Sequence, residues 1–263
     1  MGWSPVSRGI GGLRAVVLDV DGTLVDSEPD GHRVAFNLAF EEAGLEDRWD
    51  VELYGKLLEV TGGKRRLDSY FKERGMPEEE RTELAARLHA RKTEIFTEMA
   101  SEGQIPPRPG VRELLDELGN AGVRLAVATT GTRAWVRPLL DRLFGLERFE
   151  TVITADEAPQ RKPDPSAHRM ALEHLGLPAS AAPGVEDSRN GLEAARSAGL
   201  ACVVVVNNYT REQDFEGAAL VLDGFGTRDD PAVVLADPYG VGPEGRLNIE
   251  ALRRVVARSN GGG

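Results

Sequence analysis

Two aspartates, Asp19 and Asp21, follow a run of apolar residues and are separated by a single valine. Side chains alternate along an extended chain, so both carboxylates are expected on one side of it. Carboxylates so close together repel each other unless a cation neutralises them or one of them holds a proton. A hard divalent cation such as Mg²⁺ can bridge one carboxylate to a phosphate oxygen while the other carboxylate transfers protons. The pair therefore predicts metal-assisted phosphoryl transfer.

Three more polar elements follow apolar runs later in the chain: Thr129-Thr130, Lys162 and Glu186-Asp187. They supply hydroxyls for binding phosphate, a cation, and a second acidic pair, which together are the parts of a phosphoryl-transfer site. Taken singly, the first aspartate pair is more often a turn with helix caps. Thr129 alone is an ordinary strand-end hydroxyl, and Lys162 alone is a solvated surface lysine. Their occurrence in this order favours one site.

The elements that must position these residues are valine-rich runs at residues 14–20, 123–129, 151–154 and 200–206. Short apolar runs of this kind are typical of strands that are buried on both faces of a parallel sheet. Helical patterns separate them, which predicts an α/β fold with a Rossmann-like, mostly parallel sheet. Ligands bind beyond the carboxyl ends of such strands, where the polar residues are expected.

Residues 28–103 interrupt this alternation, because they show successive helical patterns with no strand between them. We expect an all-helical cap domain at 28–103, an α/β catalytic core at 13–27 and 104–263, and a loose leader at 1–12. The apolar residues of the cap recur at spacings of three, four and seven, as in Phe36, Phe40, Leu84, Leu88, Ile95 and Met99.

The end of the chain is less regular. Pro183 indicates that the strand before Glu186 is short or irregular, because proline cannot donate to a sheet. Residues 223–245 show little periodicity, and residues 247–257 predict a last helix. The three glycines 261–263 are expected to be a disordered end.

Composition limits the classes of molecule that this protein is expected to bind. The formal net charge is −11, which argues against binding a nucleic acid or an anionic membrane surface. The longest apolar run, residues 200–206, is far shorter than the roughly 20 residues of a membrane span. The single cysteine, Cys202, cannot form an intramolecular disulfide, which fits a reducing compartment and a protein that is not secreted. We expect a monomer with a small-molecule substrate.

The segments DVDGT, VATT, RKPDP and VEDS resemble the four motifs of the haloacid dehalogenase superfamily. The segments TLVDSEPDGHRVAFN, LLEVTGGKRR, LHARKTEIF, RPGV and YTREQDFEGA resemble the CbbY-like branch of that superfamily, phosphatases associated with Calvin-cycle carbon fixation. The resemblance implies a Mg²⁺-dependent phosphatase acting on a small phosphorylated sugar. The implied substrate is xylulose 1,5-bisphosphate, an inhibitor of Rubisco, and the implied compartment is bacterial cytoplasm or plastid stroma.

The resemblance also implies roles for the core residues. Asp19 would attack phosphorus and form an aspartyl-phosphate. Asp21 would protonate the leaving group and then activate water. The Thr129 hydroxyl and the Thr130 backbone N–H would bind the phosphoryl oxygens, and Lys162 would offset the charge of the phosphate and the nucleophile.

A further implication concerns the metal. Mg²⁺ would be held by Asp19, by the backbone carbonyl of Asp21 and by Asp187. Glu186 would support it directly or through water.

Substrate choice is expected from the cap, because the core motifs bind only the departing phosphate. Residues 28 and 32 are four apart and can share a helix face. The segment from Thr61 to residue 65 combines glycines, a hydroxyl and cations, as an anion-binding nest would. Lys92 lies in an apolar stripe, so its charge must reach water or an anion. Ordinary surface charge is the alternative for each cation. The candidate substrate-binding residues of the cap are Glu28, His32, Arg33, Gly63, Lys64, Arg65 and Lys92.

Other functions stay open on the core motifs alone. A sugar phosphomutase of the β-phosphoglucomutase type shares every core motif and differs in whether the cap excludes water and keeps the bisphosphate intermediate. A dehalogenase is disfavoured because it has no use for Asp21. An inactive binding or scaffold protein would be expected to have lost Asp19, Asp21, Lys162 or Asp187, and all four are present.

Overall fold

The computed structural model describes residues 12–60 and 62–261. It divides into two compact units, an α/β unit of residues 1–25 and 107–263 and a helical unit of residues 26–106. The segment predicted as a cap, 28–103, falls within the second unit. Apart from Gly12, the predicted leader lies outside the described residues, as does Thr61 of the predicted anion-binding nest.

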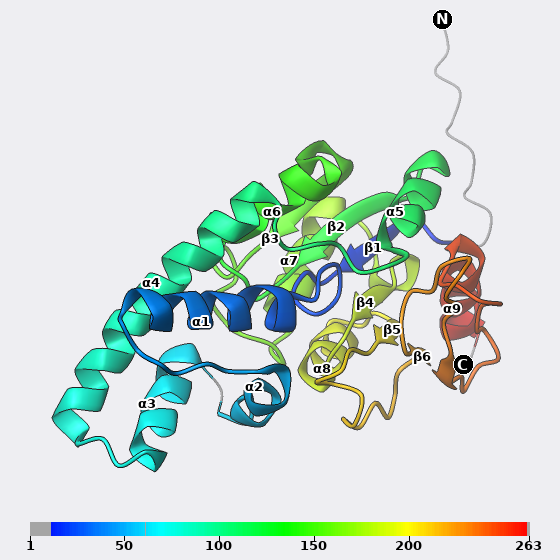
Figure 1. The fold of residues 1–263 in the computed structure, drawn as a ribbon. Coiled ribbons are helices and arrows are strands. Elements are labelled where there is room, and N and C mark those ends of the chain that lie inside the picture. Colours follow the sequence, from blue (N-terminus) through cyan, green and yellow to red (C-terminus); the bar gives the residue numbers. More distant parts are fainter. Residues whose placement is uncertain (1–11, 61, 262–263) are drawn as a thin grey trace, which may run out of the picture. The chain divides into compact units, whose positions relative to one another are not determined.

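The α/β unit is built on a seven-stranded sheet whose strand order is β3-β2-β1-β4-β5-β6-β7 (Figure 1). Neighbouring strands pair in parallel from β3 to β6, and β7 is antiparallel to β6. The mostly parallel α/β fold predicted from the sequence is therefore confirmed. The strands are β1 (Ala15–Leu18), β2 (Arg124–Ala128), β3 (Phe149–Ile153), β4 (Gly184–Glu186), β5 (Cys202–Val205), β6 (Leu220–Leu222) and β7 (Val234–Ala236).

Helices cover both faces of the sheet. The helices α7 and α8 contact each other; α7 packs on β1 to β3, and α8 packs on β4 and β5. On the other face α5 packs on β2 and on α9. The helices of this unit are α5 (Val111–Asn120), α6 (Arg133–Phe144), α7 (Ser166–Leu175), α8 (Arg189–Ser197) and α9 (Ile249–Gly261), with short turns η2 (Leu146–Arg148) and η3 (Ala179–Ala181).

The valine-rich strands form because both of their faces are buried. Ala15 and Val17 of β1 join the apolar cluster beneath α7 and α8, whereas Val16 and Leu18 alternate onto the opposite face. All four side chains are fully buried. This double burial explains why β1 is a continuous apolar run and not an alternating one.

The helical unit contains η1 (Glu28–His32), α1 (Arg33–Glu42), α2 (Val51–Leu57), α3 (Gly63–Glu73) and α4 (Glu78–Glu102). α4 packs along α1 and α3. An aromatic core joins these helices, with the ring centroid of Trp49 4.8 Å from that of Phe36 and 5.0 Å from that of Phe40. The predicted apolar stripes are buried, which confirms the inserted helical segment.

Two elements and one boundary were not predicted. β6 and β7 have three residues each and lie within short apolar runs, residues 218–222 and 232–236, that sequence analysis did not identify as strands. The side chains of β6 are buried, whereas those of β7 are exposed. The last helix begins at Ile249 and extends to Gly261, so the expectation that Gly261 begins a disordered end is wrong; residues 262 and 263 lie outside the described residues.

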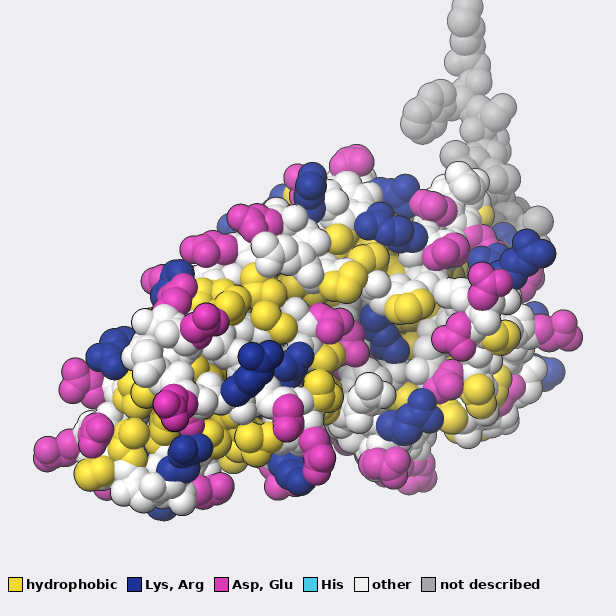
Figure 2. Space-filling model, in the orientation of Figure 1, with side chains coloured by type: hydrophobic (Ala, Val, Ile, Leu, Met, Phe, Trp, Pro, Cys, Tyr) yellow, Lys and Arg dark blue, Asp and Glu magenta, His cyan; other side chains and the backbone are white. Residues whose placement is uncertain are grey.

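Surface charge follows the acidic composition. On the face drawn in Figure 2, Asp and Glu side chains are spread widely, with Lys and Arg between them. None of the described helices is both long enough and apolar enough to span a bilayer.

Candidate active site

The polar residues predicted to act together lie at the carboxyl ends of neighbouring strands. Asp19 directly follows β1, Thr129 directly follows β2, and Glu186 is the last residue of β4. Because β2, β1 and β4 are adjacent and parallel, their carboxyl ends meet at one edge of the sheet. The topology therefore gathers residues that are far apart in the sequence.

Lys162 links two of the acidic residues. Its Nζ donates to Asp19 Oδ1 at 2.7 Å and to Glu186 Oε1 and Oε2 at 2.7 and 2.9 Å. The side chains of Lys162, Asp19 and Glu186 are 8%, 7% and 1% exposed. A solvated surface lysine, the alternative weighed from the sequence, is therefore wrong.

Burial shifts the pKa values of Asp19, Lys162 and Glu186. Burial, the largest effect, and the nearby Glu186 together raise the pKa of Asp19 to about 7, against the opposing effect of Lys162. Burial alone would lower the pKa of Lys162, but the carboxylates of Asp19 and Glu186 hold it above its ordinary value. Burial also disfavours the Glu186 carboxylate, yet Lys162 and His168 keep its pKa below the usual range. Glu186 and Lys162 thus form a buried ion pair beside Asp19.

Asp187 faces the same acidic group from the next position. Burial raises its pKa well above the ordinary value, and the charges of Asp19, Glu186 and Asp21 act in the same direction. Asn207, which sequence analysis did not identify, donates from Nδ2 to Asp187 Oδ2 at 2.8 Å.

The loop after β1 comes close to this carboxylate. Gly22 has φ +81°, and a Cβ at that position would overlap the Asp187 side chain. Only glycine fits there, for both its conformation and its size.

The acidic side chains fit a hard cation. One carboxylate oxygen from each of Asp19, Glu186 and Asp187 can be chosen so that all three lie within 4.8 Å of one another. Such an all-oxygen set suits Mg²⁺ better than a thiophilic metal. Both oxygens of Glu186 accept from Lys162, and a carboxylate oxygen has a second lone pair with which it could still bind a cation or a water.

Arg108 holds the loop that carries Asp21. Its guanidinium donates to the carbonyl of Gly22 at 2.6 Å and to those of Val205 and Val206 at 2.9 and 2.6 Å. Its backbone N–H donates to the carbonyl of Leu24. The segment RPGV was noted in the sequence only as part of a resemblance, and the structure gives its arginine a position beneath the loop.

The predicted phosphate-binding turn follows β2. The buried Thr129 hydroxyl accepts from the Gly131 backbone N–H at 3.1 Å, which leaves its own proton for another acceptor. Thr130 lies between them on the turn. Residue 131 must be small, because a Cβ there would overlap the ring of Trp135.

In the helical unit, Lys92 is buried and not a surface charge. Its Nζ lies 2.8 Å from His32 Nδ1, 5.1 Å from the ring centroid of Phe36 and 5.0 Å from that of Phe96. The residue is only 8% exposed, so the alternative of an ordinary surface charge, weighed from the sequence, is wrong for Lys92. A lysine held this way has aromatic faces and an imidazole as its neighbours.

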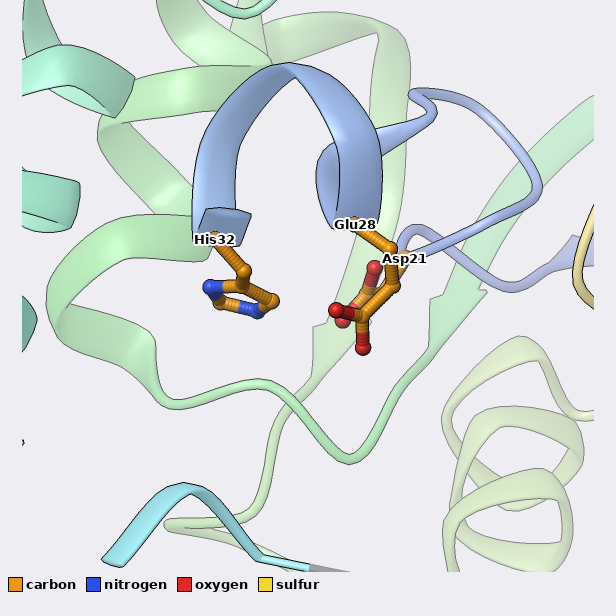
Figure 3. A group of neighbouring side chains, drawn as sticks. All are labelled: Asp21, Glu28 and His32. Carbon is orange, nitrogen blue, oxygen red and sulfur yellow. The ribbon is translucent and has the colours of Figure 1, made fainter. Parts of the chain in front are cut away.

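The turn η1 also carries Glu28. Figure 3 shows the side chains of Glu28 and His32 projecting from this one turn toward the same side. Glu28 Oε2 accepts from the Tyr54 hydroxyl at 2.5 Å, and Tyr54 in turn accepts from Arg66 Nη1 at 3.2 Å. Sequence analysis did not single out Tyr54 or Arg66, although Arg66 ends the quoted segment LLEVTGGKRR, because an aromatic residue and an arginine in a helix are ordinary.

The other predicted cap residues are arranged differently. Lys64 and Arg65 are exposed and line a surface pocket of about 590 Å³ within this unit. Gly63 is the first residue of α3, where a Cβ would overlap His89. Burial lowers the pKa of His89, and the charges of Lys92 and Lys64 lower it further. Arg33 donates to the backbone carbonyl of Trp49 at 3.2 Å, so its guanidinium helps to hold the segment that carries this aromatic residue.

Known proteins are similar to this chain in sequence and in fold. A family model described as haloacid dehalogenase-like hydrolase matches residues 13–199. A CBBY-like protein of Arabidopsis thaliana is 43% identical over 220 residues, covering 81% of this chain and 69% of that protein. A phosphoglycolate phosphatase of Pseudomonas savastanoi is 36% identical over 220 residues, covering 80% of this chain and 76% of that protein.

A solved structure is also similar to this chain. It is a mutant CbbY of Rhodobacter sphaeroides in complex with xylulose 1,5-bisphosphate, 39% identical, with a TM-score of 0.65, covering 81% of this chain and 94% of that one. The chain belongs to the haloacid dehalogenase-like hydrolase family. Within that family it is a phosphatase of CbbY-like sequence, as the motifs predicted.

Proposed function

We propose that this chain is a Mg²⁺-dependent sugar-phosphate phosphatase that acts through an aspartyl-phosphate and hydrolyses xylulose 1,5-bisphosphate. The observation that carries the proposal is the buried Asp19–Lys162–Glu186 group beside Asp187 at the carboxyl edge of the sheet. The similarity to a CbbY bound to that bisphosphate supports the choice of substrate.

The proposed reaction has two displacements at phosphorus. In the first, a carboxylate oxygen of Asp19 bonds to phosphorus, the bond from phosphorus to the sugar oxygen breaks, and Asp21 gives its proton to the leaving oxygen. In the second, Asp21 takes a proton from water, the water oxygen bonds to phosphorus, and the bond to Asp19 breaks. Inorganic phosphate leaves, and both aspartates return to their starting states.

Lys162 and the turn after β2 would stabilise the phosphoryl group during both steps. Lys162 already contacts Asp19, so its charge lies where the nucleophile meets the phosphate oxygens. The Thr129 hydroxyl and the Thr130 backbone N–H would donate to those oxygens. Fixed donors of this kind act without reorganisation when charge develops, which is the main source of their effect.

A bound Mg²⁺ would neutralise charge on the transferring phosphoryl group. Asp19, Asp187 and the backbone carbonyl of Asp21 would hold it, with Glu186 near. We expect exhaustive chelation to abolish phosphate release and added Mg²⁺ to restore it. The reason is charge: Lys162 is one cation beside three buried carboxylates and Asp21, so a further cation is needed to balance them. Phosphate release is measured after dialysis against EDTA, with Mg²⁺ or Ca²⁺ added back. Undiminished release in chelator would contradict the assignment of the metal site.

The helical unit would bind the phosphate that is not transferred. Lys92 and Lys64 concentrate positive charge there, and after burial their charges lower the pKa of His89 further. The low dielectric around the buried Lys92 ammonium would strengthen its attraction to an anion relative to that of an exposed lysine. These cations give the bisphosphate a contact that a simple ester lacks.

We expect Lys92→Ala and Lys64→Ala to lower kcat/KM for xylulose 1,5-bisphosphate about ten- to a hundredfold, the effect of losing one charge-assisted hydrogen bond. Hydrolysis of para-nitrophenyl phosphate should change little, because that ester has no second phosphate to be bound. Steady-state kinetics of both substrates measures the difference.

Lys56→Ala is the matched control, because Lys56 is an exposed lysine of the same unit paired with Glu52. It should leave both rates unchanged. Equal losses on the two substrates, or no loss on either, would remove the argument that the cap selects a bisphosphate.

The function itself is tested by products. Wild-type enzyme with Mg²⁺ is assayed on xylulose 1,5-bisphosphate, phosphoglycolate and β-glucose 1-phosphate, with phosphate release and sugar-phosphate isomers both measured. We expect the highest kcat/KM for release of phosphate from the bisphosphate. Conversion of glucose 1-phosphate to an isomer without net phosphate release would establish the mutase alternative, and preferred hydrolysis of phosphoglycolate would change the substrate.

A further inference from the structure

A buried histidine lies behind the active-site ion pair. His168, in the first turn of α7, has no exposed surface, and its Nε2 is 2.8 Å from Glu186 Oε1. That same oxygen accepts from Lys162 at 2.7 Å. His168 thus contacts the residue that holds Lys162, and the proposed reaction gives it no role.

The surroundings define the proton positions of His168. Glu186 Oε1 also accepts from Lys162, and a carboxylate oxygen beside an ammonium can only accept, so the 2.8 Å contact places a ring proton on Nε2. Among the described residues, the buried Nδ1 has no hydrogen-bond partner. A donor in the core is therefore directed at one oxygen of Glu186.

The carboxylate has little freedom to turn away. Glu186 is fully buried, and a Cβ at Gly191 on the first turn of α8 would overlap its Oε2. Lys162 contacts both oxygens from one side, and His168 contacts Oε1 from α7. The orientation of Glu186 then determines where the Lys162 ammonium lies relative to Asp19.

We propose that His168 is a positioning residue for phosphoryl transfer: its Nε2–H fixes the Glu186 carboxylate, which in turn fixes Lys162 against the nucleophile Asp19. This inference rests on the proposed function of the Asp19 site. Removing a supporting hydrogen bond of this kind behind a functional group typically lowers activity by about 10- to 100-fold. Because the bond acts on groups that bear charge during the chemical step, the loss should fall on kcat.

Three variants separate positioning from packing. His168→Leu removes the donor and leaves an apolar side chain among Ala167, Ala171 and the other apolar residues of that cluster. His168→Gln keeps an N–H at a reach similar to that of Nε2. His174→Leu is the control on the same helix, since His174 is exposed and contacts Thr151 instead of the site. kcat and KM for xylulose 1,5-bisphosphate and the melting temperature are measured for each.

We expect His168→Leu to fold and to lose about ten- to a hundredfold in kcat with KM nearly unchanged, and His168→Gln to recover most of that loss. His174→Leu should match the wild type. Wild-type kcat in His168→Leu, or equal losses in Leu and Gln, would overturn the proposal, whereas an inactive wild type would overturn the proposed function instead. If His168→Leu does not fold, His168→Met is read by the same criteria. Unfolding of both apolar variants beside a folded Gln variant would make the bond structural and the proposal wrong.

Discussion

Asp19→Asn is expected to abolish multiple turnover, with kcat lower by roughly 10⁴-fold or more, as removal of a covalent nucleophile does in other enzymes. An amide oxygen is a poor nucleophile toward phosphorus, so no aspartyl-phosphate can form. The fold should remain, because the asparagine oxygen can still accept from Lys162 at the position of Asp19 Oδ1, and the change removes a charge whose burial is unfavourable. Phosphate release measures the loss of turnover. The intact mass of the protein after mixing with substrate shows whether an aspartyl-phosphate forms.

The control for Asp19→Asn is Asp116→Asn, the same chemical change at an exposed residue paired with Arg148. It should have wild-type kinetics. A phosphorylated mass is expected for the wild type trapped during turnover and not for Asp19→Asn. Sustained phosphate release from Asp19→Asn at the wild-type rate would exclude the covalent mechanism, even if Mg²⁺ dependence held.

The strands that position the site could be predicted because each is buried on both faces. In β1 and β5 the valines fill contacts on both sides of the sheet, and that requirement is visible as an uninterrupted apolar run. β7 has the opposite character, since its side chains are exposed and the strand is held by pairing with β6. Its short apolar run, residues 232–236, stands among Gly, Asp and Pro residues and was therefore not identified as a strand.

The position of part of the core group could be predicted for the same reason. Asp19 and Thr129 each follow a strand that is recognisable as an apolar run, whereas Glu186 ends the three-residue β4, which has only a weak pattern. Their supporting residues lie elsewhere. Arg108 contacts Gly22 across 86 residues, and His168 contacts Glu186 from the interior of a helix. An arginine that follows two prolines is ordinary in a sequence, and so is a histidine in an amphipathic helix. Only the contacts in the folded structure show that Arg108 and His168 support the site.

The helical unit shows a second limit. Sequence analysis identified Arg65, but the buried arginine is its neighbour Arg66, which contacts Tyr54 and the backbone carbonyl of Leu57. A difference of one residue turns a helix position through about 100°. Two adjacent arginines therefore take opposite environments, and the apolar periodicity around them was too weak to show which one faces inward.

Lys162→Met should combine a loss of activity with a loss of stability. Removing the cation that touches Asp19 and Glu186 takes away charge stabilisation of the phosphoryl group, for which we expect kcat/KM to fall about 10²- to 10³-fold. Breaking a buried pair while leaving its carboxylates in place typically destabilises a protein by about 3–5 kcal/mol. The methionine fills most of the lysine's volume, so packing contributes little. Denaturant unfolding without metal, together with steady-state kinetics, measures both effects.

The loss of stability should depend on pH in a definite direction. Burial already raises the pKa of Asp19 to about 7 with Lys162 present, and without this cation the pKa must rise further. A carboxyl whose pKa is raised on folding destabilises the folded state progressively between its unfolded pKa and the raised value, and no further above it. Because the raised value lies higher in Lys162→Met, this destabilisation continues above pH 7 in the variant after it has levelled off in the wild type. Lys162→Met should therefore be closer to the wild type in stability below pH 7 than above it.

Lys56→Met, which breaks an exposed ion pair of 2.8 Å, should lose little stability at any pH. If the two variants lost the same stability, or if the loss in Lys162→Met were greatest at low pH, Lys162 would not be the cation that holds this site together.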